Sequence, residues 1–329
     1  MNAVVQNETQ EETQEETMAA MPVSAARTHP FYWSVRRELW EHRALWMAPL
    51  IAAGLILLSF IVSSFNLPGG ARMMATIDGT QMSAAATGFF GAMGVVIALT
   101  MIVVTWFYCL DSLFSERRDR SILFWKSLPV SDVTTVTSKL FVASAVAPSI
   151  SFAIVVATQL VILLIATAVI VFAGGSPGAL WSPGPLLQMT LVLLYSLLAQ
   201  AIWLAPFLAW LIFVSAWARR SPALWAGLVP AAACLFERIA LGTTYLLTAL
   251  QGRLVEGLAH AAFAMPALPA EPIARRDGEF SLHFGMPGRM FEAIDVVRFL
   301  STPEVWVGLA IAAALTAATV WMRRYREPL

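Results

Sequence analysis

Hydrophobic residues in this chain run in long, nearly uninterrupted stretches rather than alternating with polar ones. A membrane-spanning helix needs about 20 mostly apolar residues. Six stretches meet this length: residues 44–65, 87–110, 140–172, 186–217, 222–250 and 304–322. Stretches of this length and composition are typical of spanning helices, so the pattern predicts an all-α polytopic membrane protein with six transmembrane helices.

Two of the six stretches are longer than a bilayer requires. Residues 140–172 and 186–217 would each form about 50 Å of helix at about 1.5 Å per residue. We therefore expect these helices to tilt, to bend near Pro148 and Pro206, or to project into the cytosol. Dividing either stretch into two spans would leave too few residues for a turn.

The distribution of basic residues predicts the orientation. An even number of spans puts both termini on one side, and with that side cytoplasmic the inner segments hold fourteen of the 21 lysines and arginines. Because cytoplasmic loops carry an excess of basic residues, we expect both termini and residues 113–139 to be cytoplasmic.

The polar segments divide the chain into a tail and one domain. Residues 1–29 contain an acidic near-repeat of TQEE and are predicted to be a disordered tail. Residues 30–329 are predicted to form a single six-span domain, whose outer loop, residues 251–303, is the longest. Before the first span, "FYWSVRRELWEHRALW" mixes aromatic and basic residues, which predicts an interfacial entry helix. Thr302 followed by Pro303 is typical of a helix start.

Composition and motifs exclude several functions. The chain is 58% hydrophobic and 13% charged with a net charge of zero, so we expect no nucleic-acid partner. Neither an HExxH metal motif nor a GxSxG nucleophile turn occurs, so we expect no catalytic site and no metal site. A phosphate-binding P-loop ends in Gly-Lys-Ser/Thr. The lysines of this sequence are Lys126 and Lys139, and they follow Trp125 and Ser138 rather than glycine. We therefore expect no P-loop, so ATP hydrolysis would have to be supplied by another polypeptide.

The cytoplasmic loop between spans two and three reads "LFSERRDRSILFWKSLPVSD" over residues 113–132. Asp119 can cap a helix and Pro129 disfavours one, so a short helix over 119–128 is predicted. Ser131 or Asp132 can then cap the helix that leads into the third span. One interpretation is an interfacial helix with ordinary positive-inside charge, and the other is a docking element for a cytoplasmic partner.

These residues resemble the coupling loop of ATP-binding-cassette (ABC) type-2 transporter permeases. The resemblance implies that the loop is a coupling helix that docks on an ATPase subunit. It also implies two ATPase copies that carry ATP and Mg²⁺, a second permease copy or paralogue, no cofactor on this chain, and a bacterial inner-membrane exporter. The docking residues it implies are Glu116, Arg117, Arg118, Asp119, Arg120, Leu123, Trp125, Lys126, Leu128 and Pro129.

Four of the polar residues inside predicted spans are candidates for a transport path or an interface: Gln159, Gln200, Glu237 and Arg238. Glu237 and Arg238 have a functional and a structural interpretation. In the first they lie on a transport path or at a subunit interface, and in the second they make a structural contact to another span or mark a break in the helix. The glutamines would line a cavity or form interhelical hydrogen bonds. Two alternative functions remain: an ion-driven secondary transporter, for which Glu237 is the convincing mid-span carboxylate, and a non-transporting membrane scaffold.

Overall fold

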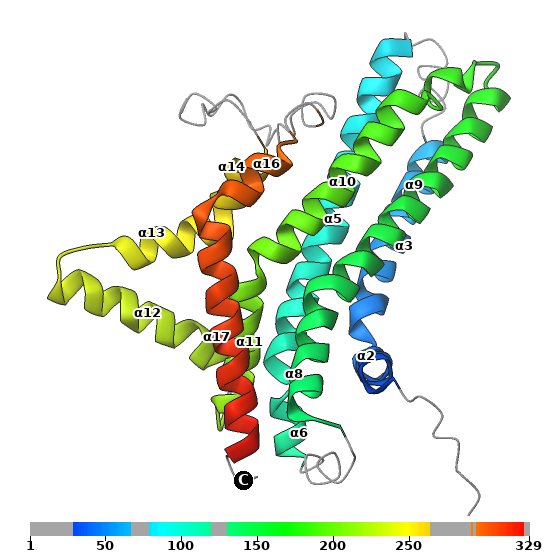
Figure 1. Ribbon diagram of the computed structural model, residues 1–329. Coiled ribbons are helices and arrows are strands. Elements are labelled where there is room, and N and C mark those ends of the chain that lie inside the picture. Colours follow the sequence, from blue (N-terminus) through cyan, green and yellow to red (C-terminus); the bar gives the residue numbers. More distant parts are fainter. Residues whose placement is uncertain (1–28, 67–78, 120–129, 264–290, 292–293, 326–329) are drawn as a thin grey trace, which may run out of the picture.

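Helices account for almost all of the regular structure in this computed structural model (Figure 1). The structure describes residues 29–66, 79–119, 130–263, 291 and 294–325. The first half contains α2 (Pro30–Glu41), α3 (Ala44–Asn66), α5 (Gly79–Asp111), α6 (Phe114–Arg118), α8 (Asp132–Phe141), the π-helical turn η1 (Val142–Val146) and α9 (Ala147–Phe172). The second half contains η2 (Pro177–Ala179), α10 (Pro183–Trp203), α11 (Ala205–Trp217), α12 (Pro222–Ala240), α13 (Tyr245–Gln251), η3 (Gly252–Glu256), α14 (Gly257–Ala262), α16 (Val296–Ser301) and α17 (Pro303–Tyr325).

Among the residues that the structure describes, six helical segments are long and apolar enough to cross a membrane, which confirms the prediction of an all-α, multi-pass membrane protein. They are Ala44–Ser64, Gly88–Arg118, Asp132–Phe172, Leu186–Trp203, Pro222–Ala240 and Pro303–Tyr325. Each overlaps one stretch predicted from hydropathy. Many large apolar side chains on these helices are exposed, including Leu55, Phe107 and Leu164, as expected where lipid rather than protein covers the surface.

Buried side chains form separate clusters along the bundle. At one end, Leu45, Tyr108 and Ile212 pack where α3, α5, α8 and α11 meet. Toward the other end, Phe90 and Ile162 pack where α5 and α9 meet. A third cluster joins α10 to α14, α16 and α17. Helix α11 packs closely along α17, so the last span belongs to the same bundle as the central helices.

Prolines explain why the two longest stretches are interrupted. Pro148 is the second residue of α9 and follows the π-helical turn η1, and Pro206 is the second residue of α11 and follows a break at Leu204. A proline inside a helix lacks the N–H donor and clashes with the carbonyl four residues earlier, so the preceding turn must widen or break. The predicted irregularities near both prolines are confirmed, and α10 and α11 run in different directions (Figure 1).

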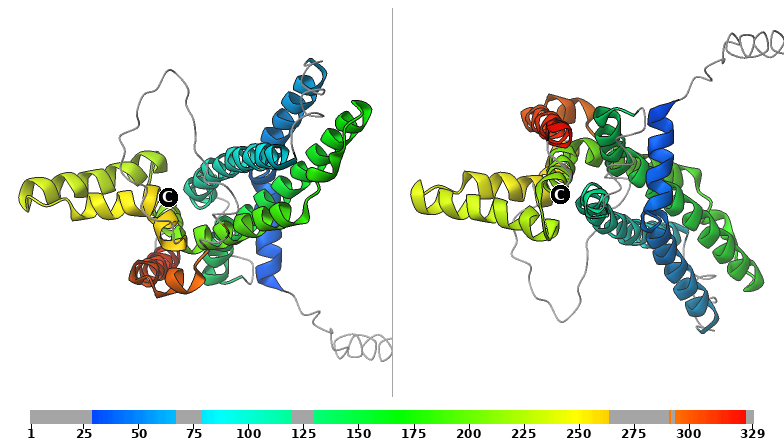
Figure 2. Two further views of the ribbon diagram at one scale, coloured as in Figure 1. Left: turned by 90° about the horizontal axis from the view of Figure 1, so that it is seen from above. Right: turned by 90° about the horizontal axis from the view of Figure 1, so that it is seen from below.

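The fifth apolar stretch, residues 222–250, is divided between two helices. Helix α12 ends at Ala240, Gly242 adopts a left-handed φ of +66°, and α13 begins at Tyr245. Glycine is the residue that takes this conformation without a steric penalty, so the chain reverses here. Helices α12 and α13 form a hairpin that projects from the bundle in all views (Figures 1 and 2).

Helix α2 lies across the ends of the long helices rather than along them. It is seen end-on in Figure 1 and side-on in Figure 2. It packs against α8, and it lies at the same end of the bundle as α6 and the end of α17. This end of the molecule therefore brings together segments from the start, the middle and the end of the sequence.

Candidate functional site

Charged side chains from four helices meet at this end of the bundle, and we call them the basal ion network. Although the helices around them are apolar, Glu38 is 1% exposed, Lys139 0% and Glu116 5%. Charges removed from water in this way are stable only when opposite charges and hydrogen bonds surround them. The network consists of Arg37 and Glu38 from α2, Glu116 from α6, Asp132 and Lys139 from α8, and Arg323 from α17.

Lys139 lies at the centre of the network. Its Nζ atom is 2.7 Å from Oε1 of Glu38 and 3.1 Å from Oε1 of Glu116. The hydroxyl of Tyr108 donates to the other oxygen of Glu38, Oε2, at 3.0 Å. One lysine therefore joins α2 to α6, and a tyrosine from α5 satisfies the remaining carboxylate oxygen.

Arg323 extends the network to the last span. Its Nη1 donates to Oε2 of Glu116 at 2.7 Å, and its Nε donates to Oδ1 of Asp132 at 2.8 Å. Nη2 of Arg37 donates to Oε1 of Glu116 at 2.8 Å. Glu116 thus pairs with three cations, one each from α2, α8 and α17.

The start of α8 positions two of these groups. Oγ of Ser131 accepts from the backbone N–H of Thr134 at 3.1 Å, which caps the first turn. Of the two predicted caps, the structure uses Ser131. Asp132 and Lys139 are seven residues apart and so share one face of α8. Asp132 meets Arg323, and Lys139 meets the two glutamates.

The charge of Arg37, on α2, is balanced by neighbouring carboxylates. Burial alone would lower the pKa of Arg37, but the neighbouring carboxylates Glu38, Glu41 and Glu116 outweigh it and raise the pKa above its ordinary value. Arg37 therefore stays charged, and its Nε binds Oε1 of Glu41 one helical turn away at 3.0 Å.

A second set of contacts ties the beginning of the 113–139 loop to α11. Oγ of Ser215 accepts from the backbone N–H groups of Leu113 and Phe114 at 3.0 and 2.9 Å. Nη2 of Arg117 donates to the carbonyls of Ser215 and Ala218 at 2.6 and 2.7 Å. A cation at the carboxyl end of a helix is favourable because unpaired carbonyls concentrate negative charge there.

The predicted docking residues therefore divide into three groups. Glu116 and Arg117 point into the bundle, which differs from the expectation that they face a partner, because their charges are paired inside the protein. Arg118 and Asp119 are exposed and pair with each other at 3.1 Å. The rest lie outside the described residues, and their docking role stays a prediction: Arg120, Leu123, Trp125, Lys126, Leu128 and Pro129.

Glu237 has a local structural role. Its carboxylate accepts from the hydroxyl of Thr243 at 2.8 Å and from the N–H groups of Tyr245 and Leu246 at 2.7 and 2.9 Å. These bonds cap the start of α13, so of the predicted roles the helix break is the one observed. Arg238 is exposed on α12.

The two glutamines lie in different surroundings. Gln159 is buried, with Nε2 3.8 Å from Sδ of Met189, so it makes an interhelical contact between α9 and α10. Gln200 lines a cavity of about 60 Å³ between α5, α9 and α10, together with Thr105, Ser144 and Ser151. One glutamine thus follows the packing interpretation and the other the cavity interpretation.

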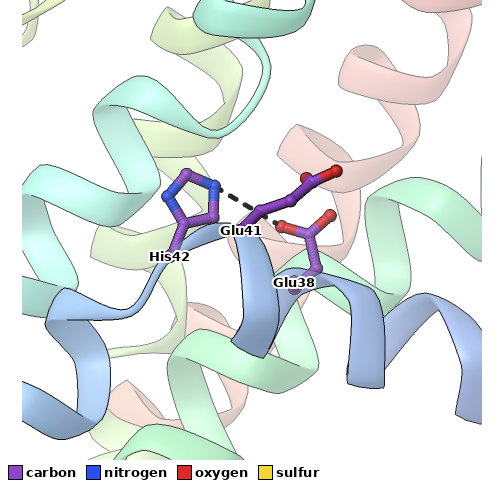
Figure 3. A group of neighbouring side chains, drawn as sticks. All are labelled: Glu38, Glu41 and His42. Carbon is purple, nitrogen blue, oxygen red and sulfur yellow. Dashed lines mark ion pairs between the residues drawn. The ribbon is translucent and has the colours of Figure 1, made fainter.

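Glu38, Glu41 and His42 gather at the end of α2, with ligand-type atoms within 4.8 Å of one another (Figure 3). Burial lowers the pKa of His42, although Glu38, whose Oε2 is 3.9 Å from Nε2, opposes this. The carboxylates already bind protein cations, Glu38 through Lys139 and Glu41 through Arg37. We therefore assign no metal to this group.

Four residues that hold this end of the molecule together were not predicted from the sequence: Glu38, Lys139 and Arg323 in the basal ion network, and Ser215 in the second set of contacts. Their partners lie far away in the sequence: 101 residues separate Glu38 from Lys139, and 191 separate Asp132 from Arg323. A usable signal was present, because Lys139 and Arg323 are charged residues at the ends of long apolar stretches.

Comparisons of the chain with protein families, with curated proteins and with solved structures find no match.

Proposed function

We propose that this chain is the membrane-spanning permease subunit of an ABC exporter, driven by ATP hydrolysis on a separate ATPase subunit. The observation that carries the proposal is the fixation of both ends of the 113–139 loop. Glu116 and Arg117 bind its first end to α17 and α11, and Asp132 and Lys139 bind its second end to α17 and α2. A force on residues 120–129 would therefore act on three other helices together.

In the proposed cycle, ATP binding closes two ATPase subunits and displaces the loop on each of two permease chains. The buried ion pairs make each loop and its neighbouring helices a stiff unit, because separating them would leave charges unpaired away from water. Movement of these units would switch a cavity between the two permeases from inward to outward access. The ATPase subunits would supply ATP and Mg²⁺, and this chain would supply the coupling surface.

The contacts of Glu237 favour this proposal over an ion-driven transporter. A carboxylate that couples transport to an ion must bind and release that ion during each cycle. Glu237, the mid-span candidate, instead has both carboxylate oxygens engaged in capping α13.

The proposed orientation places the basal ion network at the cytoplasmic face of the bacterial inner membrane, with both termini on that side. Helix α2, lying across the span ends, would then be the interfacial entry helix. A cysteine replacing Ser127 should be protected from an impermeant thiol reagent added to intact cells, and one replacing Ser281 should be labelled. Labelling of the first from outside would reverse the orientation and remove the proposed docking.

Purification from native membranes tests the function itself. The tagged chain should bring with it a P-loop ATPase in equal amounts, and Leu123→Glu should reduce that amount without changing the yield of the chain. Val297→Glu is the matched control, since Val297 is exposed on α16 at the other end of the bundle. Absence of any ATPase would favour the membrane-scaffold alternative.

A further inference from the structure

A groove of about 710 Å³ opens between α8 and α17 at the same end of the bundle as the ion network. One wall is formed by Val133, Thr137 and Leu140 of α8, and the other by α17 from Leu309 to Tyr325. Ala205, at the start of α11, also lines it. The side chains along the middle of α17 are small, namely Ala312, Ala313, Thr316 and Ala317, which gives the groove its depth.

The lining is effectively hydrocarbon despite its two threonines. Oγ1 of Thr137 donates to the carbonyl of Val133 at 2.6 Å, and Oγ1 of Thr316 donates to that of Ala312 at 2.7 Å. Both hydroxyls are therefore satisfied within their own helices and offer no free donor to an occupant. An apolar chain is the kind of ligand that such walls accommodate without cost.

The end of the groove nearest the network has a different character. Trp321 and Tyr325 are exposed there, and the Arg324 guanidinium lies 5.7 Å from the ring centre of Tyr325. Among the described residues Arg324 has no ion-pair partner. The nearby carboxylate of Asp132 is already neutralised by Arg323, which points inward. The groove thus ends in an available positive charge flanked by aromatic rings.

We propose that this groove binds one acyl chain of an anionic glycerophospholipid, with the lipid phosphate at Arg324. The groove lies between two membrane-spanning segments, and its volume falls within the range of about 300 to 1,000 Å³ typical of ligand sites. Tryptophan and tyrosine mark the headgroup level, and basic residues between helices bind anionic headgroups. Lipid tails are as apolar as leucine, so Arg324 must supply the preference for negative charge.

This binding does not depend on the proposed function. The proposed orientation would place this lipid in the cytoplasmic leaflet. A measurement in detergent depends neither on that orientation nor on the proposed function. If the lipid experiment fails, the proposal of an ATPase partner still stands. If no ATPase is found, the proposed lipid site still stands.

To test the site, phosphatidylglycerol or phosphatidylcholine is added to the purified, delipidated protein, and native mass spectrometry measures which lipid is retained. The wild-type chain should retain one phosphatidylglycerol in preference to phosphatidylcholine. Ala313→Phe should abolish retention of this lipid by filling the groove, whereas Ala314→Phe, one residue away, exposed and outside the lining, should not. Arg324→Gln should reduce the preference for phosphatidylglycerol about fivefold, as expected for one arginine near a headgroup.

Ala317→Leu fills the same groove less drastically and serves if Ala313→Phe is not recovered folded. Equal lipid retention and preference in the wild type and the groove-filling variants would overturn the proposal. So would a loss of oligomer mass in these variants with lipid retention unchanged, because the groove would then be an interface between copies of the chain.

Discussion

Replacing Lys139 by methionine is the most informative perturbation of the basal ion network. Lys139 is completely buried and lies 2.7 Å from Glu38 and 3.1 Å from Glu116. Glu116 would keep Arg37 and Arg323, but Glu38 would keep only the hydroxyl of Tyr108 at 3.0 Å and a longer contact, 3.5 Å, with Nη2 of Arg37 among its close polar partners in the described part of the chain. Removing one member of a buried ion pair costs about 3 to 5 kcal/mol, so we expect Lys139→Met to lower the unfolding free energy by that amount.

A second substitution separates the charge effect from general damage to the core. Glu38→Gln removes the negative charge but keeps an oxygen that accepts from Tyr108. In the double variant no unpaired charge remains, so most of the loss in Lys139→Met should be recovered. The two substitutions should therefore be strongly non-additive, with an interaction energy of about 2 kcal/mol or more.

Unfolding in mixed micelles with increasing sodium dodecyl sulfate, followed by the fluorescence of the 12 tryptophans, measures these differences. Arg118→Met is the control, because the Arg118–Asp119 pair is exposed and its loss should leave the unfolding curve unchanged. The reasoning is refuted if Lys139→Met is no more destabilising than Arg118→Met, or if the double variant is as unstable as the sum of the single ones.

Three further predictions concern single positions. Ser221 has a left-handed φ of +46° between α11 and α12, so Ser221→Gly should raise the unfolding free energy by about 0.5 to 1 kcal/mol and Ser221→Val should lower it in the same assay. At Gly308 an added Cβ would collide with the guanidinium of Arg253, which stacks on Trp203 with 4.3 Å between its central carbon and the ring centre. Gly308→Ala should therefore lower the unfolding free energy by about 1 to 3 kcal/mol. Gly54→Ala is the control, because it has open space around it and should cost nothing measurable. Burial lowers the pKa of His42 below 6.5, so the contribution of its neutral form to stability is complete above pH 6.5 and declines as the pH falls below that value. His42→Gln should therefore flatten the loss of thermal stability between pH 7.5 and 5.5. An unchanged slope would contradict this.

Local features of the sequence predicted much of the fold. Apolar length identified the six helices of spanning length in the described part of the chain, because a bilayer imposes a minimum length on any spanning helix. Prolines 148 and 206 marked the interruptions, and Pro303 marked the start of the last helix, because proline acts on its own and the preceding turn. A helix break near Glu237 was one of several interpretations of that carboxylate, and hydropathy could not select it because residues 222–250 stay apolar across the reversal at Gly242.

The basal ion network was not predictable in the same way. Hydropathy and capping rules depend on neighbours within a few residues, whereas Glu116 pairs with Arg37, Lys139 and Arg323 from three separate helices. The 113–139 loop was interpreted as a docking element or an interfacial helix, yet the charges of Glu116 and Arg117 are held inside the bundle. A charge run shows only that a segment is polar, and the direction of each side chain depends on the tertiary structure.

Photocrosslinking from the loop in native membranes tests the central claim most directly. A photoreactive amino acid replacing Trp125 should crosslink the chain to a polypeptide that contains a P-loop, identified by mass spectrometry of the crosslinked band. The same amino acid replacing Trp306, exposed at the opposite end of α17, should give no such product. Crosslinking from position 125 only to lipid, or to a protein without a P-loop, would contradict the proposal that this loop docks on an ATPase.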